Sequence, residues 1–196
     1  MTQTNNQKKR IRTLIRQQRQ QLSAQQLARA AQNLTINAFN FHELNSAKEV
    51  ASYLALHGEL SPHALHSKLT SAEIYLPRIT SLHRSEMAFY PARNKRIKNS
   101  FGIQEPVPSF PAKPMQHFDV ILMPLIAFDR KGNRLGMGGG FYDRALAFRQ
   151  QRKLIKRPLL VGIAHHFQEI DSITPEKWDI PLDAILTDQE LIRISR

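Results

Sequence analysis

The pattern that decides the fold lies in residues 118–143, which read FDVILMPLIAFDRKGNRLGMGGGFYD. The stretch 118–124 is an almost unbroken apolar run, typical of a strand that is buried on both faces of a parallel sheet. It leads into a loop in which four of the five residues at 136–140 are glycine, and a helix is expected over 142–151. A buried strand, a glycine-rich turn and a helix together predict an α/β unit.

Helical and strand patterns alternate outward from this unit. Two helices are expected over 6–22 and 24–39, with Ser23 as the N-cap of the second, and a third runs to residue 69 from a proline at its first position. Strands are expected over 49–56, 73–77, 87–90, 159–164 and 184–186, the second of them ending at its proline. Residues 92–113 are rich in proline, lysine and arginine and predict an irregular surface segment. The alternation predicts an α/β fold with a largely parallel sheet.

Composition narrows the class of protein. The chain has 196 residues, 41% of them hydrophobic, and nothing marks a domain boundary, so one domain over 1–196 is expected. The absence of cysteine excludes disulfides, thiolate metal sites, iron–sulfur clusters and a cysteine nucleophile. No apolar run approaches the roughly 20 residues of a membrane helix, and no apolar segment follows the basic N-terminus as in a secretory signal. A soluble, cytoplasmic protein is the expectation.

Charge points to an anionic ligand. Lysine and arginine number 28 against 16 acidic residues, a net charge of +12, and residues 1–42 hold seven of these cations and no acid. Such a surface attracts nucleic acid, nucleotides, phosphates or polycarboxylates. On the first expected helix, an apolar flank of Ile11, Leu14, Ile15 and Leu22 adjoins a basic stripe of Lys8, Arg12, Arg16 and Arg19. That stripe is either a solvated helix face or part of a binding site.

The glycine-rich loop is the sharpest candidate for a site. Glycines let the backbone approach a ligand and turn successive N–H groups toward it, and Lys131 and Arg134 add formal charge. The loop is neither a Walker A motif nor a dinucleotide fingerprint, since Phe141 stands at the third glycine position. It is therefore either a phosphate-binding loop or a tight strand-to-helix turn. Asp143 is correspondingly a Mg²⁺ ligand beside phosphates or a solvated carboxylate at a helix start.

Other candidate groups give weaker signals. Glu59 follows an expected strand, at the sheet edge where α/β proteins bind ligands, although without further evidence the residue reads as an ordinary loop glutamate. Histidines at 63, 66, 165 and 166 lack a spacing that would guarantee three converging metal ligands. No Gly-x-Ser-x-Gly motif is present to indicate a serine hydrolase.

The residues also resemble a known family. The stretch from Met123 to Asp143 closely resembles the signature of the 5-formyltetrahydrofolate cyclo-ligase family, also called methenyltetrahydrofolate synthetases. Weaker resemblances follow in the family's order along nearly the whole chain, at 8–12, 53–60, 75–78, 102–106 and 178–183. The resemblance implies a three-layer α/β fold with a Rossmann-like, largely parallel sheet and an N-terminal basic helix.

The resemblance also implies an activity. It implies an enzyme that uses ATP and Mg²⁺ to convert 5-formyltetrahydrofolate to 5,10-methenyltetrahydrofolate. The reaction would pass through a phosphorylated formyl intermediate and release ADP and phosphate. It implies that Arg134 serves catalysis, that Leu54 and Glu59 contact the folate, and that Asp143 and Asp179 hold Mg²⁺. From the spacing alone, Asp179 could equally be a turn cap before Pro181. The resemblance implies that ATP is bound by Lys8, Lys9, Arg10, Ile11 and Arg12, and by Arg134, Leu135, Gly136, Met137, Gly138, Gly139, Gly140, Phe141 and Tyr142.

The expected partners follow from this resemblance. The substrate is a small molecule, including polyglutamylated forms of the folate, whose acidic tail suits a basic surface. A monomer without nucleic-acid or membrane partners is expected. Two rivals stay open on the residues alone. One is a nucleic-acid-binding module over 1–42, although its basic stripe lacks interleaved aromatic residues. The other is a different nucleotide-using α/β enzyme with another acceptor.

Overall fold

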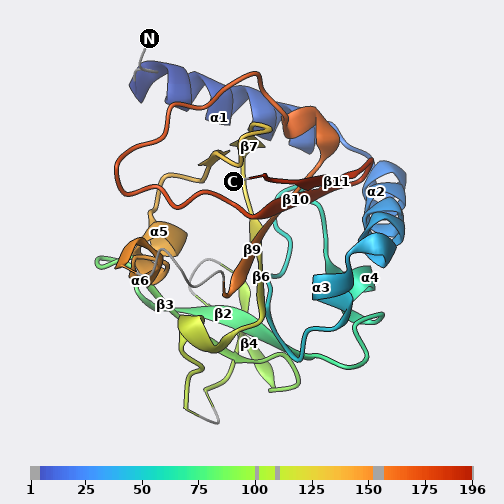
Figure 1. Ribbon diagram of the computed structural model, residues 1–196, viewed down its shortest axis with the longest axis vertical. Coiled ribbons are helices and arrows are strands. Elements are labelled where there is room, and N and C mark those ends of the chain that lie inside the picture. Colours follow the sequence, from blue (N-terminus) through green and yellow to red (C-terminus); the bar gives the residue numbers. More distant parts are fainter. Residues whose placement is uncertain (1–4, 100–101, 109–110, 152–156, 196) are drawn as a thin grey trace.

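A seven-stranded sheet forms the centre of the protein, seen in a computed structural model that describes residues 5–99, 102–108, 111–151 and 157–195 (Figure 1). Its strand order is β11-β10-β9-β6-β1-β2-β3. The five central strands run parallel, and β3 and β11 pair antiparallel at the two edges. The strands are β1 Glu49–Ala51, β2 Glu73–Ser81, β3 Glu86–Pro91, β6 Val120–Pro124, β9 Leu159–Ala164, β10 Ala184–Thr187 and β11 Leu191–Arg193.

Helices cover both faces of this sheet. The layer of α2, α3 and α4 lies on the opposite side from α5 and α6 in Figure 1, while α1 crosses one end of the sheet near β7. The helices are α1 Asn5–Gln20, α2 Ala24–Asn37, α3 His42–Asn45, α4 His63–His66, α5 Phe141–Ala145 and α6 Phe148–Gln151, with 3₁₀ turns at Ala38–Asn40, Met115–His117 and His166–Gln168. The predicted three-layer, largely parallel α/β fold is thereby confirmed.

The core follows from the alternation of strand side chains. In β6, Val120 and Leu122 pack with the α2–α4 layer, whereas Ile121 and Met123 pack in the cluster on the other face. All four are essentially inaccessible to solvent. Because successive side chains of a strand point to opposite faces, an apolar run of this kind can be buried only between two helical layers. The strongest apolar run in the sequence therefore lies in the middle of the sheet.

Two small antiparallel pairs lie outside the main sheet. The pair β4 Arg96–Lys98 and β5 Gln104–Pro106 falls within 92–113, where an irregular segment was expected. The pair β7 Ala127–Phe128 and β8 Arg134–Leu135 frames the turn that precedes the glycine loop. Inside that turn, the buried carboxylate of Asp129 accepts hydrogen bonds from the backbone of Lys131, Asn133 and Ile173. These bonds hold the start of the glycine loop to the segment that follows β9.

Local signals at the helix ends are largely confirmed. Ser23 caps α2 through a reciprocal capping box with Gln26, as expected of serine followed three residues later by glutamine. The helix expected from Pro62 to residue 69 is shorter at both ends: it begins at His63, with Pro62 in the N-cap position, and it ends at His66. The helix expected over 142–151 is two short helices, because the chain turns at Leu146, whose fully buried side chain packs beneath the sheet.

Two expected strand boundaries are wrong. The strand expected over 49–56 ends at Ala51, because the next side chains turn to other partners: Ser52 bonds to His66 and the Tyr53 hydroxyl donates to the carbonyl of Leu60. The strand expected to end at Pro77 continues through Ser81. Pro77 and Tyr75 face the same side of β2, toward β1. The carbonyl of Tyr75 accepts the last hydrogen bond from that side, from the backbone N–H of Ser52. Because β1 ends there, Pro77 has no strand beside it that would need its N–H.

The topology creates an opening at the carboxyl edge of the sheet. The chain passes from β1 to β2 over the face that carries α4, and from β6 to β9 over the face that carries α5 and α6. The loops that leave the neighbouring strands β1 and β6 therefore diverge. Such switch points are where open α/β sheets bind ligands. Within the part of the chain described above, no helix combines the length and apolar character needed to cross a bilayer.

Candidate active site

A cavity of about 480 Å³ opens at this switch point. Its walls come from α1, the loop after β1, the end of β6, the glycine loop and the segment 173–179. Apolar side chains from the loop after β1, from β2 and β3, and from the residue before β5 line part of it, namely Leu54, Leu56, Leu76, Ile79, Met87 and Ile103. Another part is lined by charged groups and glycine backbone. An apolar pocket with a few convergent polar groups is the usual form of a small-molecule site.

The N-terminal half of α1 contributes two cations to the cavity. Lys8 is only 8% exposed and its ammonium lies 2.8 Å from a carboxylate oxygen of Glu176. Arg12, one turn later, donates from Nε to the carbonyl oxygen of Gly136 at 2.9 Å. Burial and the neighbouring Arg16 lower the pKa of Arg12, so a bound anion would relieve charge repulsion there. Lys9, Arg10 and Ile11 do not line the cavity.

The reason lies in the face that α1 presents to the protein. Lys9 and Arg10 point to solvent, and Ile11 packs with Ile15 against the β7–β8 pair. Leu14, which the apolar spacing placed on the buried flank, is 50% exposed. The face toward the protein is instead made by the buried Lys8, Ile15 and Arg19 and the partly exposed Ile11 and Arg12, so three of its five residues are cations. The helix is anchored by apolar contacts near its middle and by charged contacts toward both ends.

The glycine loop lies directly beneath Arg12. Gly138 has φ +101°, and a Cβ added there would lie 3.8 Å from the Arg12 guanidinium. Gly140 has φ +68° and stands at the N-cap of α5. Residues with a side chain rarely adopt these backbone conformations, which is why glycine occupies both positions. Because α5 has only five residues, the positive charge of this region comes mainly from Lys8, Arg12 and Arg134 rather than from the helix start.

Arg134 joins the glycine loop to the expected metal ligands. Its guanidinium, with a side chain only 7% exposed, donates to the carbonyl of Ile180 and pairs with the carboxylate of Asp143. Asp179 lines the same cavity, and its carboxylate accepts a hydrogen bond from the backbone N–H of Glu176 at 2.8 Å. Burial, with a further contribution from Asp179, raises the pKa of Asp143, and Arg134 opposes that rise. The two carboxylates are thus close enough to repel each other.

The donor chemistry of this pair fits Mg²⁺. Magnesium takes one or two carboxylates together with phosphate oxygens and water, and it would cancel the repulsion between Asp143 and Asp179. Among the described residues, one cluster of three possible ligands occurs elsewhere, at His166, Glu169 and Glu190. Arg130 already pairs with both of its glutamates, at 2.7 and 2.6 Å.

Leu54 and Glu59 are the residues expected to contact the folate. Both line the cavity, on the loop that leaves β1. Glu59 accepts a hydrogen bond from the backbone N–H of Leu56 at 3.0 Å, and its other oxygen lies 3.5 Å from Arg19. Burial raises the pKa of Glu59, while Leu56 and Arg19 oppose the rise. Tyr53 and Tyr142, whose hydroxyls have pKa values raised by burial, complete this side.

Three features of the site were absent from the sequence-based prediction of its residues. Glu176 pairs with Lys8, Trp178 lines the cavity mouth with 60% of its surface exposed, and Arg19 lies behind Glu59. Trp178 stands next to Asp179 in a stretch already singled out, so that adjacency was a usable signal. Glu176 gave none, and Arg19 appeared only as one cation of the basic stripe, because their partners lie 168 and 40 residues away in the chain (176 − 8 and 59 − 19).

The fold and the cavity together define an α/β enzyme whose site suits an anionic ligand beside a largely apolar one. A family model described as the 5-formyltetrahydrofolate cyclo-ligase family matches residues 4–188. The chain belongs to this family, as its signature residues predicted.

Individual relatives agree with this assignment. The chain is 39% identical over 184 residues to the 5-formyltetrahydrofolate cyclo-ligase of Haemophilus influenzae, covering 91% of this chain and 96% of that protein. It is 35% identical over 179 residues to the Escherichia coli K12 protein of the same name, covering 89% and 96%. The solved structure of Aquifex aeolicus 5,10-methenyltetrahydrofolate synthetase superposes with a TM-score of 0.80 at 29% identity, covering 96% of this chain and 93% of that one.

Proposed function

We propose that the protein converts 5-formyltetrahydrofolate to 5,10-methenyltetrahydrofolate with hydrolysis of ATP to ADP and phosphate in the presence of Mg²⁺. Family membership supports the folate reaction. The observation that carries the ATP and Mg²⁺ requirement is the arrangement at one end of the cavity. There Lys8, Arg12 and Arg134 surround a loop of glycines, next to the carboxylates of Asp143 and Asp179.

The chemistry requires activation of a poor leaving group. The formyl oxygen of 5-formyltetrahydrofolate attacks the γ-phosphorus of ATP, and ADP leaves with the electron pair of the broken bond. The folate's own N10 then attacks the activated formyl carbon, N10 loses its proton, and phosphate departs with the former formyl oxygen. Phosphoryl transfer depends on positioning and on charge neutralisation rather than on a protein nucleophile. The residues around this cavity are suited to that task.

Each part of the site has a role in this proposal. Arg12 and Lys8 bind phosphate oxygens from the α1 side, and the backbone N–H groups of 136–140 bind them from below. Arg134 stabilises the charge of the transferring phosphoryl group, held in orientation by its bonds to Ile180 and Asp143. When bound, Mg²⁺ neutralises phosphate charge, with Asp143 and Asp179 as its protein ligands.

The other half of the cavity is assigned to the folate. Its apolar wall suits a flat ring system, and the carboxylate of Glu59 provides a hydrogen-bond acceptor for ring N–H groups. Leu54 contributes contact area from the same loop. The basic surface around α1 suits the glutamate tail, including polyglutamylated forms. We further propose that the protein acts as a cytoplasmic monomer without a nucleic-acid partner.

The experiment is a direct assay of the product. Purified protein is mixed with ATP, Mg²⁺ and 5-formyltetrahydrofolate, and the absorbance of methenyltetrahydrofolate is followed while ADP is measured in parallel. The expected result is one ADP per methenyltetrahydrofolate and no product when either ATP or Mg²⁺ is omitted. ATP hydrolysis with other formylated or carboxylated acceptors, but not with this folate, would favour the rival nucleotide-using enzyme. Product formation without ATP would refute the proposed mechanism.

A further inference from the structure

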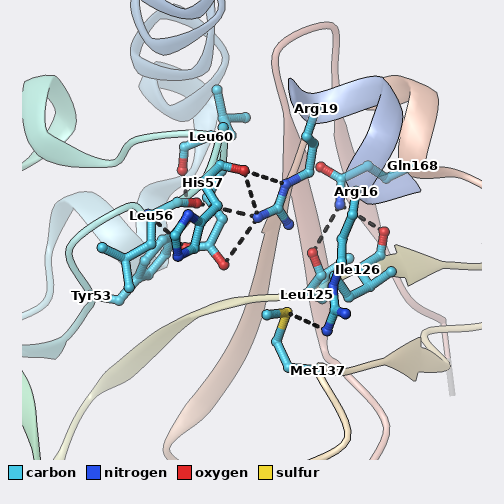
Figure 2. A network of polar contacts seen from close by, with 12 residues as sticks. Arg16, Arg19, Tyr53, Leu56, His57, Leu60, Leu125, Ile126, Met137 and Gln168 are labelled. Atoms are coloured by element: carbon cyan, nitrogen blue, oxygen red, sulfur yellow. Dashed lines mark hydrogen bonds and ion pairs between the residues drawn. The ribbon is translucent and has the colours of Figure 1, made fainter. Parts of the chain in front are cut away.

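Arg19 is a fully buried cation that the proposed chemistry does not use. It lies in the last turn of α1, is 2% exposed and does not line the cavity. Figure 2 shows its guanidinium directed at the loop that follows β1. Its Nε donates to the carbonyl of His57 at 3.2 Å, and its Nη2 donates to the carbonyls of Leu56 and His57 at 3.2 and 3.1 Å. The same Nη2 lies 3.5 Å from Glu59 Oε1.

The turn that Arg19 contacts has an unusual backbone. His57 and Gly58 both have positive φ values, 48° and 74°. For histidine this is an uncommon conformation that persists only where surrounding contacts enforce it. The neighbouring carbonyls of Leu56 and His57 point toward Arg19, and the Leu56 carbonyl also accepts the backbone N–H of Glu59. The planar guanidinium, with several N–H groups in a fixed fork, supplies donors to both of them.

A second element holds the same turn from the other side. His165, which directly follows β9, has its Nε2 at 3.1 Å from the carbonyl oxygen of Gly58. A Cβ added at Gly58 would come within 2.5 Å of the Arg19 carbonyl oxygen, so the turn lies directly on the backbone of α1. The turn is therefore fixed between α1 and the end of β9. Its position determines where Glu59 enters the cavity.

We propose that Arg19 is a positioning residue for the folate half of the site, acting through Glu59 and the turn at 56–59. This proposal rests on the proposed function, because it assigns Glu59 to the folate. Arg19 orients one oxygen of Glu59, while Leu56 N–H binds the other. It also ties the turn that carries Glu59 to the helix that carries Lys8 and Arg12, so the residues assigned to the folate and those assigned to the phosphates are held by the same helix.

The first test compares Arg19→Lys and Arg19→Met with the natural protein. Lysine keeps the charge but offers a single point donor, whereas methionine removes both the charge and the donors. We expect the KM for 5-formyltetrahydrofolate to rise about tenfold or more in each variant, the loss expected for a hydrogen bond to a charged group. The KM for ATP should stay within about twofold. If Arg19→Met fails to fold, Arg19→Lys carries the comparison.

The matched control is Arg29→Gln. Arg29 is an exposed arginine of α2 outside the cavity, so the control removes one positive charge from the surface without touching the site. Both KM values should be unchanged in it. A rise of the ATP and folate KM values by equal factors in the Arg19 variants would overturn the proposal, because it would indicate general loss of structure.

A double-mutant cycle separates positioning from mere stabilisation. In a Glu59→Gln background, Arg19→Met should raise the folate KM less than about threefold further, since its effect passes through Glu59. Additive effects would refute the proposal. The natural protein reports on the proposed function independently. If it makes no methenyltetrahydrofolate, the function and this role both fall, whereas an active natural protein with unchanged folate KM in Arg19→Lys and Arg19→Met removes only the role of Arg19.

Discussion

Replacing Gly58 by alanine tests the packing of the 56–59 turn on α1. Gly58 has φ +74°, a left-handed conformation that costs an L-residue about 1–2 kcal/mol. The new Cβ would also lie 2.5 Å from the carbonyl oxygen of Arg19 and 3.0 Å from its carbonyl carbon. Both are backbone atoms of a helix and cannot rotate away, so overpacking adds about 1–3 kcal/mol. The expected loss in the free energy of unfolding is therefore about 2–5 kcal/mol.

Gly102 provides a matched control. It has the same φ, +74°, but a Cβ added there meets nothing within 4 Å. Gly102→Ala should therefore lose only the conformational part, about 1–2 kcal/mol. Urea unfolding of both variants and of the natural protein, checked for equal m-values, measures the difference. Equal losses in the two variants would refute the reasoning, because they would mean that the turn does not press on the backbone of Arg19.

Three further predictions concern the phosphate wall, the metal ligands and a buried histidine. Arg12→Ala should raise the ATP KM about tenfold. The free energy of unfolding should change by less than about 1 kcal/mol, since the hydrogen bond from Arg12 to Gly136 is exposed to solvent. An unchanged ATP KM would contradict the placement of α1 at the ATP site. Asp143→Asn should raise the Mg²⁺ concentration needed for half-maximal rate, and Asp179→Asn should do so less, as magnesium titrations at fixed ATP would reveal. Burial lowers the pKa of His66 to about 4, so at pH values between about 4 and 6.5 the unfolded chain is protonated at His66 more readily than the folded protein. The free energy of unfolding should therefore fall as the pH drops through this range, by up to about 3 kcal/mol. Unfolding of His66→Asn at several pH values should show a correspondingly flatter profile, and parallel profiles would be the contrary result.

Much of the fold could be predicted because the decisive signals are local. The apolar run in β6 and the capping box at Ser23 need no knowledge of distant residues. The end of β1 was missed because its causes are not local: Ser52 bonds to His66, and Tyr53 bonds to Leu60 across a loop. Pro77 was misjudged for a related reason. Proline ends a strand only where its missing N–H faces a partner, and that depends on where β1 stops.

The residues of the candidate site also fall into those that nearby sequence signalled and those that only distant partners explain. The glycine loop, Arg134 and Asp143 lie close together in sequence, and the structure brings them together in one cavity. The basic stripe of the first helix included Arg19 but left open whether it was a solvated face or part of a binding site, and only the family resemblance assigned Lys8 and Arg12 to ATP. Arginine is rarely buried, and here the carbonyls of Leu56 and His57 together with the carboxylate of Glu59 explain its burial.

The face of α1 that holds Lys8, Arg12 and Arg19 has a consequence for insertions and deletions. Arg19 lies eleven positions after Lys8 (19 − 8), which is about three turns and about 16 Å of helix. A single residue inserted between Arg12 and Arg19 would rotate one end relative to the other by about 100° and turn either the two N-terminal cations or Arg19 away from the protein. Point changes at exposed positions such as Gln17 or Gln18 would leave the spacing intact. The register of this helix, more than the identity of most of its residues, is what the enzyme must preserve.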